Sequence, residues 1–366
     1  MKVNIMLSFS GNGGVEKMAV NLMKGFVKLD KKVTLYRIKD RGMFVKRIPR
    51  EVNLIQLPSK HTFLNLPYLI RLFKKDPPDS LLVMKERAGI VSLLAKKISN
   101  VKTKIFIRFG THITRSLDEK NMPIIYKKFR LTLLKKMLPM AHGIIAVSNG
   151  VKRDIAQICP DINEKIKVIP NPVITDELYK MANKEIQEEW LERDKKIPVI
   201  TAMGRLTYQK GFDVLLHALS IVKQNMDVKL IIIGDGELKS MLLNQAFKLR
   251  LQNNVKFLGF KENPYPYIKN SDLFVLSSRW EGSPNALTEA LALGVPCVST
   301  DCETGPREIL QNGKLGPLVE VDNHIQLAEK IIKTLKRSKN KDELSEGVRQ
   351  FNYLESAKLY LDFIKN

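Results

Sequence analysis

Short apolar segments alternate along the whole chain with longer segments in which apolar residues recur at helical spacing. This alternation predicts parallel β-strands joined by α-helices, because a crossover between parallel strands needs a connection long enough for a helix. In the first half the predicted strands are 2–8, 32–37, 53–57, 80–84, 104–109, 143–147 and 165–169. The predicted helices there are 14–29, 65–75, 88–99, 122–138 and 149–158.

A second α/β series follows a break in this pattern. Pro170-Asn171-Pro172 closes the first series, and 174–196 is rich in Glu, Asp and Lys, as expected of a solvated and partly helical connector. The predicted strands of the second series are 197–203, 228–233, 255–259, 272–276, 295–299 and 316–320. The predicted helices are 210–225, 237–250, 264–270, 284–293, 305–311, 323–338 and, after a break at 340–351, 352–365.

These two series, and a length of 366 residues, predict two domains of similar size, at 1–172 and 173–350. Each is expected to be a Rossmann-like parallel sheet with helices on both faces. Ligands of such sheets bind outside the carboxyl ends of the strands. We therefore expect the two strand-end crevices to face each other across a cleft that holds the ligand.

Positive charge is concentrated in the first half of the chain. Residues 1–150 carry 30 Lys and Arg against 9 Asp and Glu, which is +21 of a formal net charge of +23, so the other 216 residues contribute only +2. A general enrichment in lysine would explain the number of cations but not their segregation. We expect this half to face an anionic partner, such as lipid head groups, a phosphate-bearing acceptor or nucleic acid.

Composition also bears on the cellular compartment. No apolar run approaches the ~20 residues needed to span a bilayer. The first residues, MKVNIMLSFSGNGG, are interpreted as a strand that runs into a glycine turn rather than as a signal peptide. The three cysteines, Cys159, Cys297 and Cys302, lack metal-ligand spacing, which indicates a reducing cytoplasm and no disulfide framework.

The stretch 277–310, SSRWEGSPNALTEALALGVPCVSTDCETGPREIL, contains the densest candidate chemistry. A predicted buried strand ends there, and a helix follows for which Ser283 is the expected N-cap and Pro284 the first helical residue. The amide N–H groups of that first turn form an anion site. Glu281 precedes this site, and Glu289 lies about one and a half turns into the helix. A phosphate site flanked by two carboxylates suits a nucleotide-sugar, which has hydroxyl groups on either side of a diphosphate.

Five segments, in order, resemble the GT-B retaining glycosyltransferases of family four, which carry a Glu-x7-Glu motif. The segments are GNGGVEKMAVNL (11–22), GRLTYQKGFDVLLHA (204–218), IIIGDGEL (231–238), VKFLGF (255–260) and the stretch 277–310. The form of the last segment is most similar to bacterial enzymes that build surface polysaccharides, lipopolysaccharide or lipid-linked oligosaccharides from UDP-sugars. The resemblance covers essentially the whole chain and implies that the terminal segment, 352–366, packs back on the first domain.

The resemblance implies roles for several residues of the second domain. Arg205 and Lys210 would contact the diphosphate and neutralise the leaving UDP. Glu281 would accept hydrogen bonds from the donor sugar, and Glu289 would accept them from the ribose hydroxyls. A helix-dipole role for Glu289 is a poor alternative, because its apolar neighbours indicate a buried helix, where a carboxylate needs partners. Backbone close to the donor would come from Gly282, Ser283, Pro284 and Asn285, and near uracil from Leu258 and Gly259.

The first domain offers weaker candidates. Gly13 and Gly14 would let the backbone approach the phosphates, although most glycine pairs after a strand are simple turns. Glu16 is assigned no chemistry. By resemblance, His112 would bind the donor sugar or position the acceptor hydroxyl, and the alternative is a surface-loop histidine. Arg108 is a lesser candidate for contact with phosphate or acceptor.

The segment 123–140, PIIYKKFRLTLLKKMLPM, is interpreted as a basic amphipathic helix suited to an anionic membrane surface. An ordinary helix with its apolar face on the core would explain the apolar residues but not the five cations. The cations are Lys127, Lys128, Arg130, Lys135 and Lys136. We therefore expect a cytoplasmic protein that binds peripherally to the inner face of the cell membrane.

The predicted reaction transfers a hexose or N-acetylhexosamine from a UDP-sugar to a hydroxyl of a lipid-linked or polysaccharide acceptor, in bacterial cell-surface glycan synthesis. The transition state would be oxocarbenium-like, and the resemblance implies retention of the anomeric configuration, with the leaving phosphate taking the acceptor proton. Catalysis then depends on stabilising the departing diphosphate. No Asp-x-Asp occurs in the chain, so we expect no cofactor and no metal requirement.

Other functions fit parts of the pattern. A UDP-sugar epimerase or a phosphorylase on the same fold would share the nucleotide site, but an epimerase would need no membrane-facing basic domain. A glycoside hydrolase would use paired carboxylates but leave Arg205 and Lys210 without a role. A basic nucleic-acid-binding protein would need aromatic residues among its cations, or a recognisable module, and neither is present. The donor sugar, the acceptor, the linkage and the oligomeric state are not fixed by the sequence.

Overall fold

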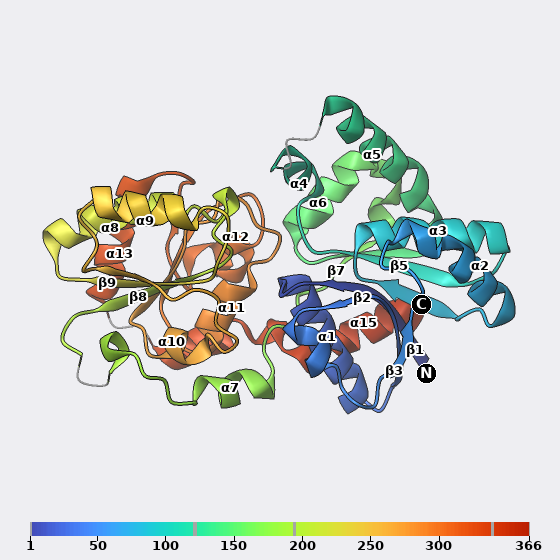
Figure 1. The fold of residues 1–366 in the computed structure, drawn as a ribbon, viewed down its shortest axis with the longest axis horizontal. Coiled ribbons are helices and arrows are strands. Elements are labelled where there is room, and N and C mark those ends of the chain that lie inside the picture. The colour runs from blue at the N-terminus through green and yellow to red at the C-terminus, as the bar shows by residue number, and fades with distance from the viewer. Residues whose placement is uncertain (1, 120–122, 193–194, 338–339, 366) are drawn as a thin grey trace. The chain divides into compact units, whose positions relative to one another are not determined.

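The computed structural model describes residues 2–119, 123–192, 195–337 and 340–365. The chain forms two compact units, of which unit 1 contains Met1–Val173 with Phe351–Asn366 and unit 2 contains Ile174–Gln350. Each unit is built on a parallel sheet with helices on both of its faces (Figure 1). The predicted fold class, two Rossmann-like parallel-sheet domains, is confirmed.

Unit 1 contains a seven-stranded sheet in the order β3-β2-β1-β4-β5-β6-β7. Its strands are β1 (Lys2–Ser10), β2 (Lys32–Arg41), β3 (Asn53–Gln56), β4 (Ser80–Val83), β5 (Lys104–Phe109), β6 (Gly143–Ala146) and β7 (Ile166–Val168). Its helices are α1 (Gly14–Lys28), α2 (Leu66–Lys75), α3 (Glu86–Ser99), α4 (Ile113–Glu119), α5 (Ile124–Met137), α6 (Asn149–Ile158) and α15 (Tyr353–Lys365).

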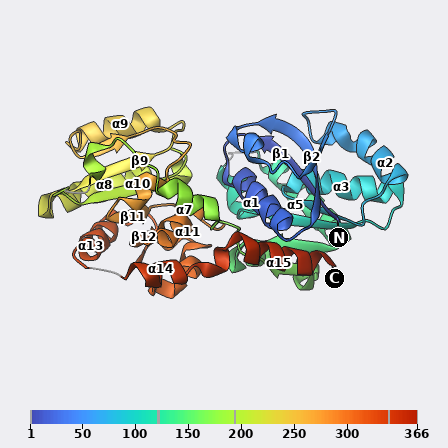
Figure 2. The same ribbon diagram turned by 90° about the horizontal axis from the view of Figure 1, so that it is seen from below.

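Both faces of the unit 1 sheet are buried, which explains the continuous apolar runs of its central strands. Successive strand residues point to opposite faces. In β1, Ile5 and Leu7 pack with apolar residues of α1 and α15, whereas Met6 packs with those of α2 and α3. The terminal helix α15 therefore belongs to the core of unit 1, beside α1 (Figure 2).

Unit 2 contains a six-stranded parallel sheet in the order β10-β9-β8-β11-β12-β13. Its strands are β8 (Val199–Met203), β9 (Lys229–Ile233), β10 (Val255–Phe257), β11 (Leu273–Leu276), β12 (Cys297–Thr300) and β13 (Leu318–Val319). Its helices are α7 (Asp176–Ala182), α8 (Phe212–Asn225), α9 (Lys239–Lys248), α10 (Tyr265–Lys269), α11 (Asn285–Ala292), α12 (Pro306–Ile309), α13 (His324–Leu335) and α14 (Lys341–Glu346).

Two helices form where the sequence pattern predicts none. α14 lies inside the predicted break at 340–351 and has a local cap, in which the Asn340 side chain accepts a hydrogen bond from the Asp342 N–H. That cap could have been recognised from the Asn-x-Asp-Glu sequence. The start of α4 is instead stabilised by another helix, because the Asp154 carboxylate of α6 accepts a hydrogen bond from the Ile113 N–H. No local sequence pattern reveals such a contact.

The connector at 174–196 is partly helical, as predicted, through α7 and a 3-10 turn at Glu189–Leu191. Parts of some predicted segments lie outside the described residues, namely 122, 193, 194, 338 and 366. Among the helices of the described residues, none is both long and apolar enough to cross a membrane.

Candidate active site

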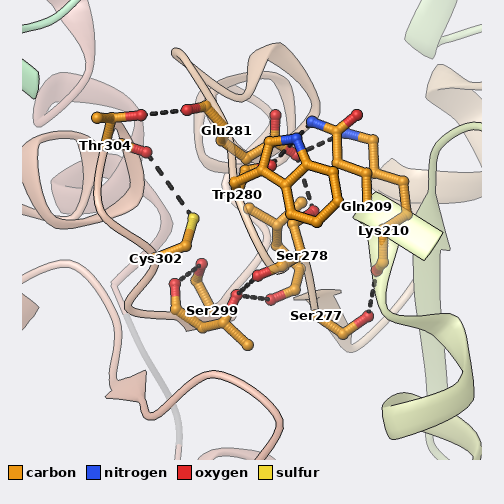
Figure 3. Close-up of polar contacts among 11 residues, drawn as sticks. Gln209, Lys210, Ser277, Ser278, Trp280, Glu281, Ser299, Cys302 and Thr304 are labelled. Atoms are coloured by element: carbon orange, nitrogen blue, oxygen red, sulfur yellow. Dashed lines mark hydrogen bonds and ion pairs between the residues drawn. The ribbon is translucent and has the colours of Figure 1, made fainter. Parts of the chain in front are cut away.

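Two turns at the carboxyl edge of the unit 2 sheet, one after β8 and one after β11, are joined by hydrogen bonds (Figure 3). The Ser277 hydroxyl donates to the Lys210 carbonyl at 2.9 Å. The Arg279 N–H donates to the Gln209 carbonyl at 2.8 Å, and the Gln209 side chain donates to the Trp280 carbonyl, also at 2.8 Å. The strand ends and these bonds together fix the two turns against each other.

Gly211 allows this close approach. Its φ of +60° lies in the left-handed region, and a Cβ added there would lie 2.1 Å from the Ser277 carbonyl oxygen. Any other residue would therefore be strained by its backbone conformation and would also clash with the neighbouring turn. The Lys-Gly pair at 210–211 thus places a lysine where the β11 turn can reach it.

Lys210 and Glu281 form an ion pair between these turns. The Lys210 Nζ lies 2.5 Å from Glu281 Oε1, and the Ser278 hydroxyl donates to the same oxygen at 2.8 Å. The Lys210 and Glu281 side chains are only 18% and 8% exposed, so each charge depends on the other for stabilisation. The sequence predicted both residues for the site but not their pairing.

The end of β12 and the loop after it hold the turn that carries Glu281 (Figure 3). The Thr300 hydroxyl donates to the Ser278 carbonyl at 2.5 Å, and the Thr304 hydroxyl donates to the Glu281 carbonyl. Burial, and then the charge of the Glu281 carboxylate, raise the pKa of the Cys302 thiol well above its usual range. Cys302 is therefore a neutral, buried neighbour of the site rather than a nucleophile.

The helix α11 starts one residue later than predicted. It begins at Asn285, because Pro284 has an extended backbone (φ −70°, ψ 99°) and is itself the N-cap residue. The prediction of Ser283 as N-cap is therefore wrong. In its first turn, the Leu287 and Thr288 N–H groups donate to the Pro284 carbonyl, at 3.1 and 3.3 Å. The anion site expected at this helix start stays a prediction.

Glu289 lies in the second turn of α11 and is 1% exposed. The prediction that it belongs to a buried helix is confirmed, and its binding to a ribose stays a prediction. At the helix start, Gly282 and Pro284 are buried, whereas Ser283 and Asn285 are half-buried and reach the surface.

The other unit 2 candidates lie at the same sheet edge. Arg205 follows β8 and is exposed, and its side chain makes no hydrogen bond or ion pair with any described residue. The Leu258 N–H donates to the Ile232 carbonyl at 3.0 Å, and the Gly234 N–H donates to the Gly259 carbonyl at 2.9 Å. These two backbone bonds place the turn after β10 beside the end of β9.

Arg279 is a supporting residue that the sequence analysis missed. Its guanidinium binds both carboxylate oxygens of Asp213, at 3.0 and 2.6 Å, forms an ion pair with Asp322 at 2.7 Å and lies 3.9 Å from the ring centroid of Tyr208. Burial alone would lower the pKa of Arg279, but the hydrogen bonds and charges of the two carboxylates outweigh it, so the pKa is raised. Arg279 thereby anchors the β11 turn to the start of α8.

In unit 1, Gly13 is the N-cap residue of α1 and Gly14 is its first residue. Glu16, in the same first turn, forms a second ion pair, with Lys85. Glu16 is 3% exposed and its Oε1 accepts from Lys85 Nζ at 2.7 Å and from the Ser10 hydroxyl at 3.0 Å. A Cβ on Gly13 would lie 2.7 Å from Glu16 Oε2. Burial raises the pKa of Glu16, but Lys85 outweighs it and the net shift is downward. Glu16, which was assigned no chemistry, thus supports the glycine loop.

Arg108, which lies in β5, and His112, which follows the strand, differ in accessibility. His112 is 14% exposed, and its Nδ1 lies 3.2 Å from Asp154 Oδ1. Arg108 is 2% exposed and donates to the Asn171 side chain at 2.5 Å, next to Tyr360 of α15. The hypothesis that Arg108 contacts phosphate or acceptor is therefore wrong, because its strand position points the side chain into the interior.

The cations of α5 are not equivalent. Arg130 donates twice to Glu86, at 2.8 and 2.6 Å, and these bonds raise the pKa of its guanidinium. Lys127 is half-buried. The remaining three, Lys128, Lys135 and Lys136, are exposed, and we call them the exposed α5 lysines.

The apolar residues of α5 divide in the same way. Near its end, Leu134 and Met137 are buried in the core, as an ordinary surface helix requires. Its first turns instead expose Ile124, Ile125, Tyr126 and Phe129, by between 59% and 72%. The core-facing alternative therefore explains only the second half of the helix.

Comparison with known proteins identifies the family. The model described as Glycosyltransferase Family 4 matches residues 12–177, and that described as Glycosyl transferases group 1 matches residues 183–351. An N-acetylgalactosamine-N,N'-diacetylbacillosaminyl-diphospho-undecaprenol 4-alpha-N-acetylgalactosaminyltransferase of Campylobacter jejuni is 30% identical over 88% of this chain and 87% of its own length. An uncharacterized glycosyltransferase, MJ1059 of Methanocaldococcus jannaschii, is 36% identical over 66% of this chain, but the match spans only 60% of that relative.

A solved structure with a similar fold is Anabaena Alr3699/HepE in complex with UDP and glucose. It superposes with a TM-score of 0.74 at 20% identity, covering 100% of this chain and 96% of the other. The two family models divide the chain much as its two α/β units do. The chain therefore belongs to the GT-B glycosyltransferases of family 4.

Proposed function

We propose that this glycosyltransferase moves a hexose or N-acetylhexosamine from a UDP-sugar to a hydroxyl group of a lipid-linked or polysaccharide acceptor in bacterial surface-glycan synthesis, with retention of the anomeric configuration. The observation that carries the proposal is the Lys210–Glu281 pair at the carboxyl edge of the unit 2 sheet, one turn from the start of α11.

The leaving diphosphate needs positive charge that is already in place when the glycosidic bond breaks. Lys210 is held beside Glu281, Arg205 is exposed at the same edge, and the start of α11 contributes the positive end of a helix dipole. When the donor binds, its phosphates supply further anionic partners for Lys210. Because these groups supply the charge, the proposed reaction requires no metal ion.

Glu281 is proposed to bind the hydroxyls of the donor sugar and to stabilise the positive charge that develops on its ring. Its Oε1 accepts hydrogen bonds from the Lys210 ammonium and the Ser278 hydroxyl, which hold the carboxylate in place. Glu289 is proposed to bind the ribose, Leu258 and Gly259 the uracil, and the Gly13–Gly14 loop the phosphates. Retention would follow if the leaving phosphate accepts the proton of the attacking hydroxyl on the same face.

The acceptor is proposed to lie at an anionic membrane surface on the cytoplasmic side. Three observations support this: the positive charge of the first half of the chain, the exposed α5 lysines and the exposed apolar side chains at the start of α5. Cations beside exposed aromatic and aliphatic residues are typical of an interfacial helix. The Campylobacter relative, named for an undecaprenol-linked acceptor, and the UDP and glucose of the Anabaena complex are consistent with these substrate classes.

A donor and acceptor screen tests the proposal. The purified chain is incubated with UDP-, GDP- and ADP-sugars, with and without undecaprenyl-diphosphate-linked oligosaccharides, in the presence of a chelator. We expect UDP release that depends on the acceptor, and a product whose anomeric configuration, read by NMR, matches that of the donor. Equal release without acceptor, conversion of the donor to its epimer, or an inverted product would contradict the proposal.

A further inference from the structure

One buried carboxylate organises the segment that carries His112. Asp154 of α6 is 1% exposed, and it accepts hydrogen bonds from the start of α4. The Ile113 N–H donates to Asp154 Oδ2 at 2.5 Å, and the Thr114 hydroxyl donates to Oδ1. The His112 Nδ1 lies 3.2 Å from Asp154 Oδ1 and 3.0 Å from the Thr114 oxygen.

These contacts decide which nitrogen of the imidazole carries the proton in its neutral form. A hydroxyl has one proton, and that of Thr114 is given to Asp154. Toward His112, the Thr114 oxygen can then only accept, and an ionised carboxylate also only accepts. Both neighbours of Nδ1 are therefore acceptors, so Nδ1 must be the donor.

We propose that Asp154 is a positioning residue, assisted by Thr114, that fixes His112 as the Nδ1–H tautomer. An imidazole held in this way carries a lone pair on Nε2. Any hydroxyl of a sugar or acceptor that binds the neutral ring at Nε2 must therefore donate to it. The orientation of His112 follows from contacts within unit 1 alone, whereas the identity of the hydroxyl rests on the proposed function.

The tautomer can be observed directly by NMR. Selective 15N labelling of histidine gives five residues, and His112→Asn identifies the signals of His112. Long-range 1H–15N spectra of the neutral form distinguish a protonated ring nitrogen from one with a lone pair. We expect Nδ1 to be protonated in the wild type and in Thr114→Val, because that variant keeps the carboxylate that faces Nδ1. In Asp154→Asn, the amide group can donate to Nδ1, so we expect a shift toward the Nε2–H tautomer.

Kinetics test the positioning role. Asp154→Asn should lower kcat by about 10- to 100-fold, the range found for carboxylates that orient metal-ligating histidines. In the His112→Asn background, Asp154→Asn should have almost no further effect on kcat, because the histidine through which Asp154 acts is absent. A wild-type Nε2–H tautomer, an unchanged tautomer in Asp154→Asn, or full additivity of the two substitutions would each overturn the inference. If the wild type transfers no sugar at all, the proposed function fails while the NMR result still decides the tautomer.

Discussion

Removing either partner of the Lys210–Glu281 pair should destabilise unit 2 as well as impair transfer. Lys210→Met keeps a long side chain but leaves Glu281 Oε1 with the Ser278 hydroxyl as its donor. Glu281→Gln keeps the shape of the side chain and leaves the Lys210 ammonium without its anion. In either variant, the remaining charge reaches water only through the small exposed part of its side chain, 8% for Glu281 and 18% for Lys210.

The expected size follows from this partial burial. Breaking a buried pair by removing one partner costs about 3 to 5 kcal/mol, whereas an exposed pair contributes about 0 to 1 kcal/mol. The pair is mostly but not fully buried, so we expect a loss of about 2 to 3 kcal/mol in the free energy of unfolding for each single variant. The double variant leaves no charge unpaired, so its loss should be smaller than the sum of the single losses by about 1 to 3 kcal/mol.

Urea unfolding followed by tryptophan fluorescence measures these losses in the relevant unit. The chain has two tryptophans, Trp190 and Trp280, and both lie in unit 2. Because Trp280 neighbours Glu281, circular dichroism serves as the second probe. If the losses of the single variants add to that of the double variant within about 0.5 kcal/mol, the two charges are not coupled and the reasoning is refuted.

Three further predictions concern other parts of the molecule. Gly211→Ala should lower the free energy of unfolding of unit 2 by about 2 kcal/mol or more. Gly313→Ala should cost less, because φ is positive there too but nothing lies within 4 Å of an added Cβ. Equal losses would contradict the proposed clash. Replacing the exposed α5 lysines by Gln should weaken binding to anionic vesicles by about 100-fold and leave activity on a soluble acceptor intact, and unchanged vesicle binding would rule out a membrane role for them. The pKa of Glu16 is lowered in the folded state. The ionised Glu16 therefore stabilises the fold above its unfolded pKa of about 4.3, and this stabilisation is lost as the pH falls through the lowered pKa. The stability difference between wild type and Glu16→Gln, measured by circular dichroism, should therefore shrink at acid pH, and a difference independent of pH would be the contrary result.

Local periodicity was sufficient to predict the fold class and the position of each strand among the described residues. A strand buried on both faces, such as β1, needs a continuous apolar run, and such runs are visible without knowing which helices cover them. The departures concern helices, and for α14 the missed cap was visible in the local sequence. α4 is held by Asp154 from α6, and the start of α11 was misjudged because Pro284 is extended rather than helical.

The candidate site was predictable as a set of residues but not as a set of contacts. Lys210 and Glu281 are 71 residues apart, and only the parallel order of β8 and β11 brings their turns together. The partners of Arg279 come likewise from separate turns and could not be paired from the sequence. The charge of Arg108 suggested a ligand contact, whereas its strand register sends it into the core.

A matched pair of lysine variants tests the central claim most directly. Lys210 pairs with Glu281 at the carboxyl edge of the unit 2 sheet, whereas Lys195 pairs with Asp272 at the amino end of β11, with a Lys195 side chain that is similarly buried at 16% exposed. The measurement is acceptor-dependent release of UDP from the preferred UDP-sugar. We predict that Lys210→Met lowers the rate by about 10²- to 10³-fold while Lys195→Met stays near the wild type. A Lys210→Met rate equal to that of the Lys195→Met control, in folded protein, would contradict the account.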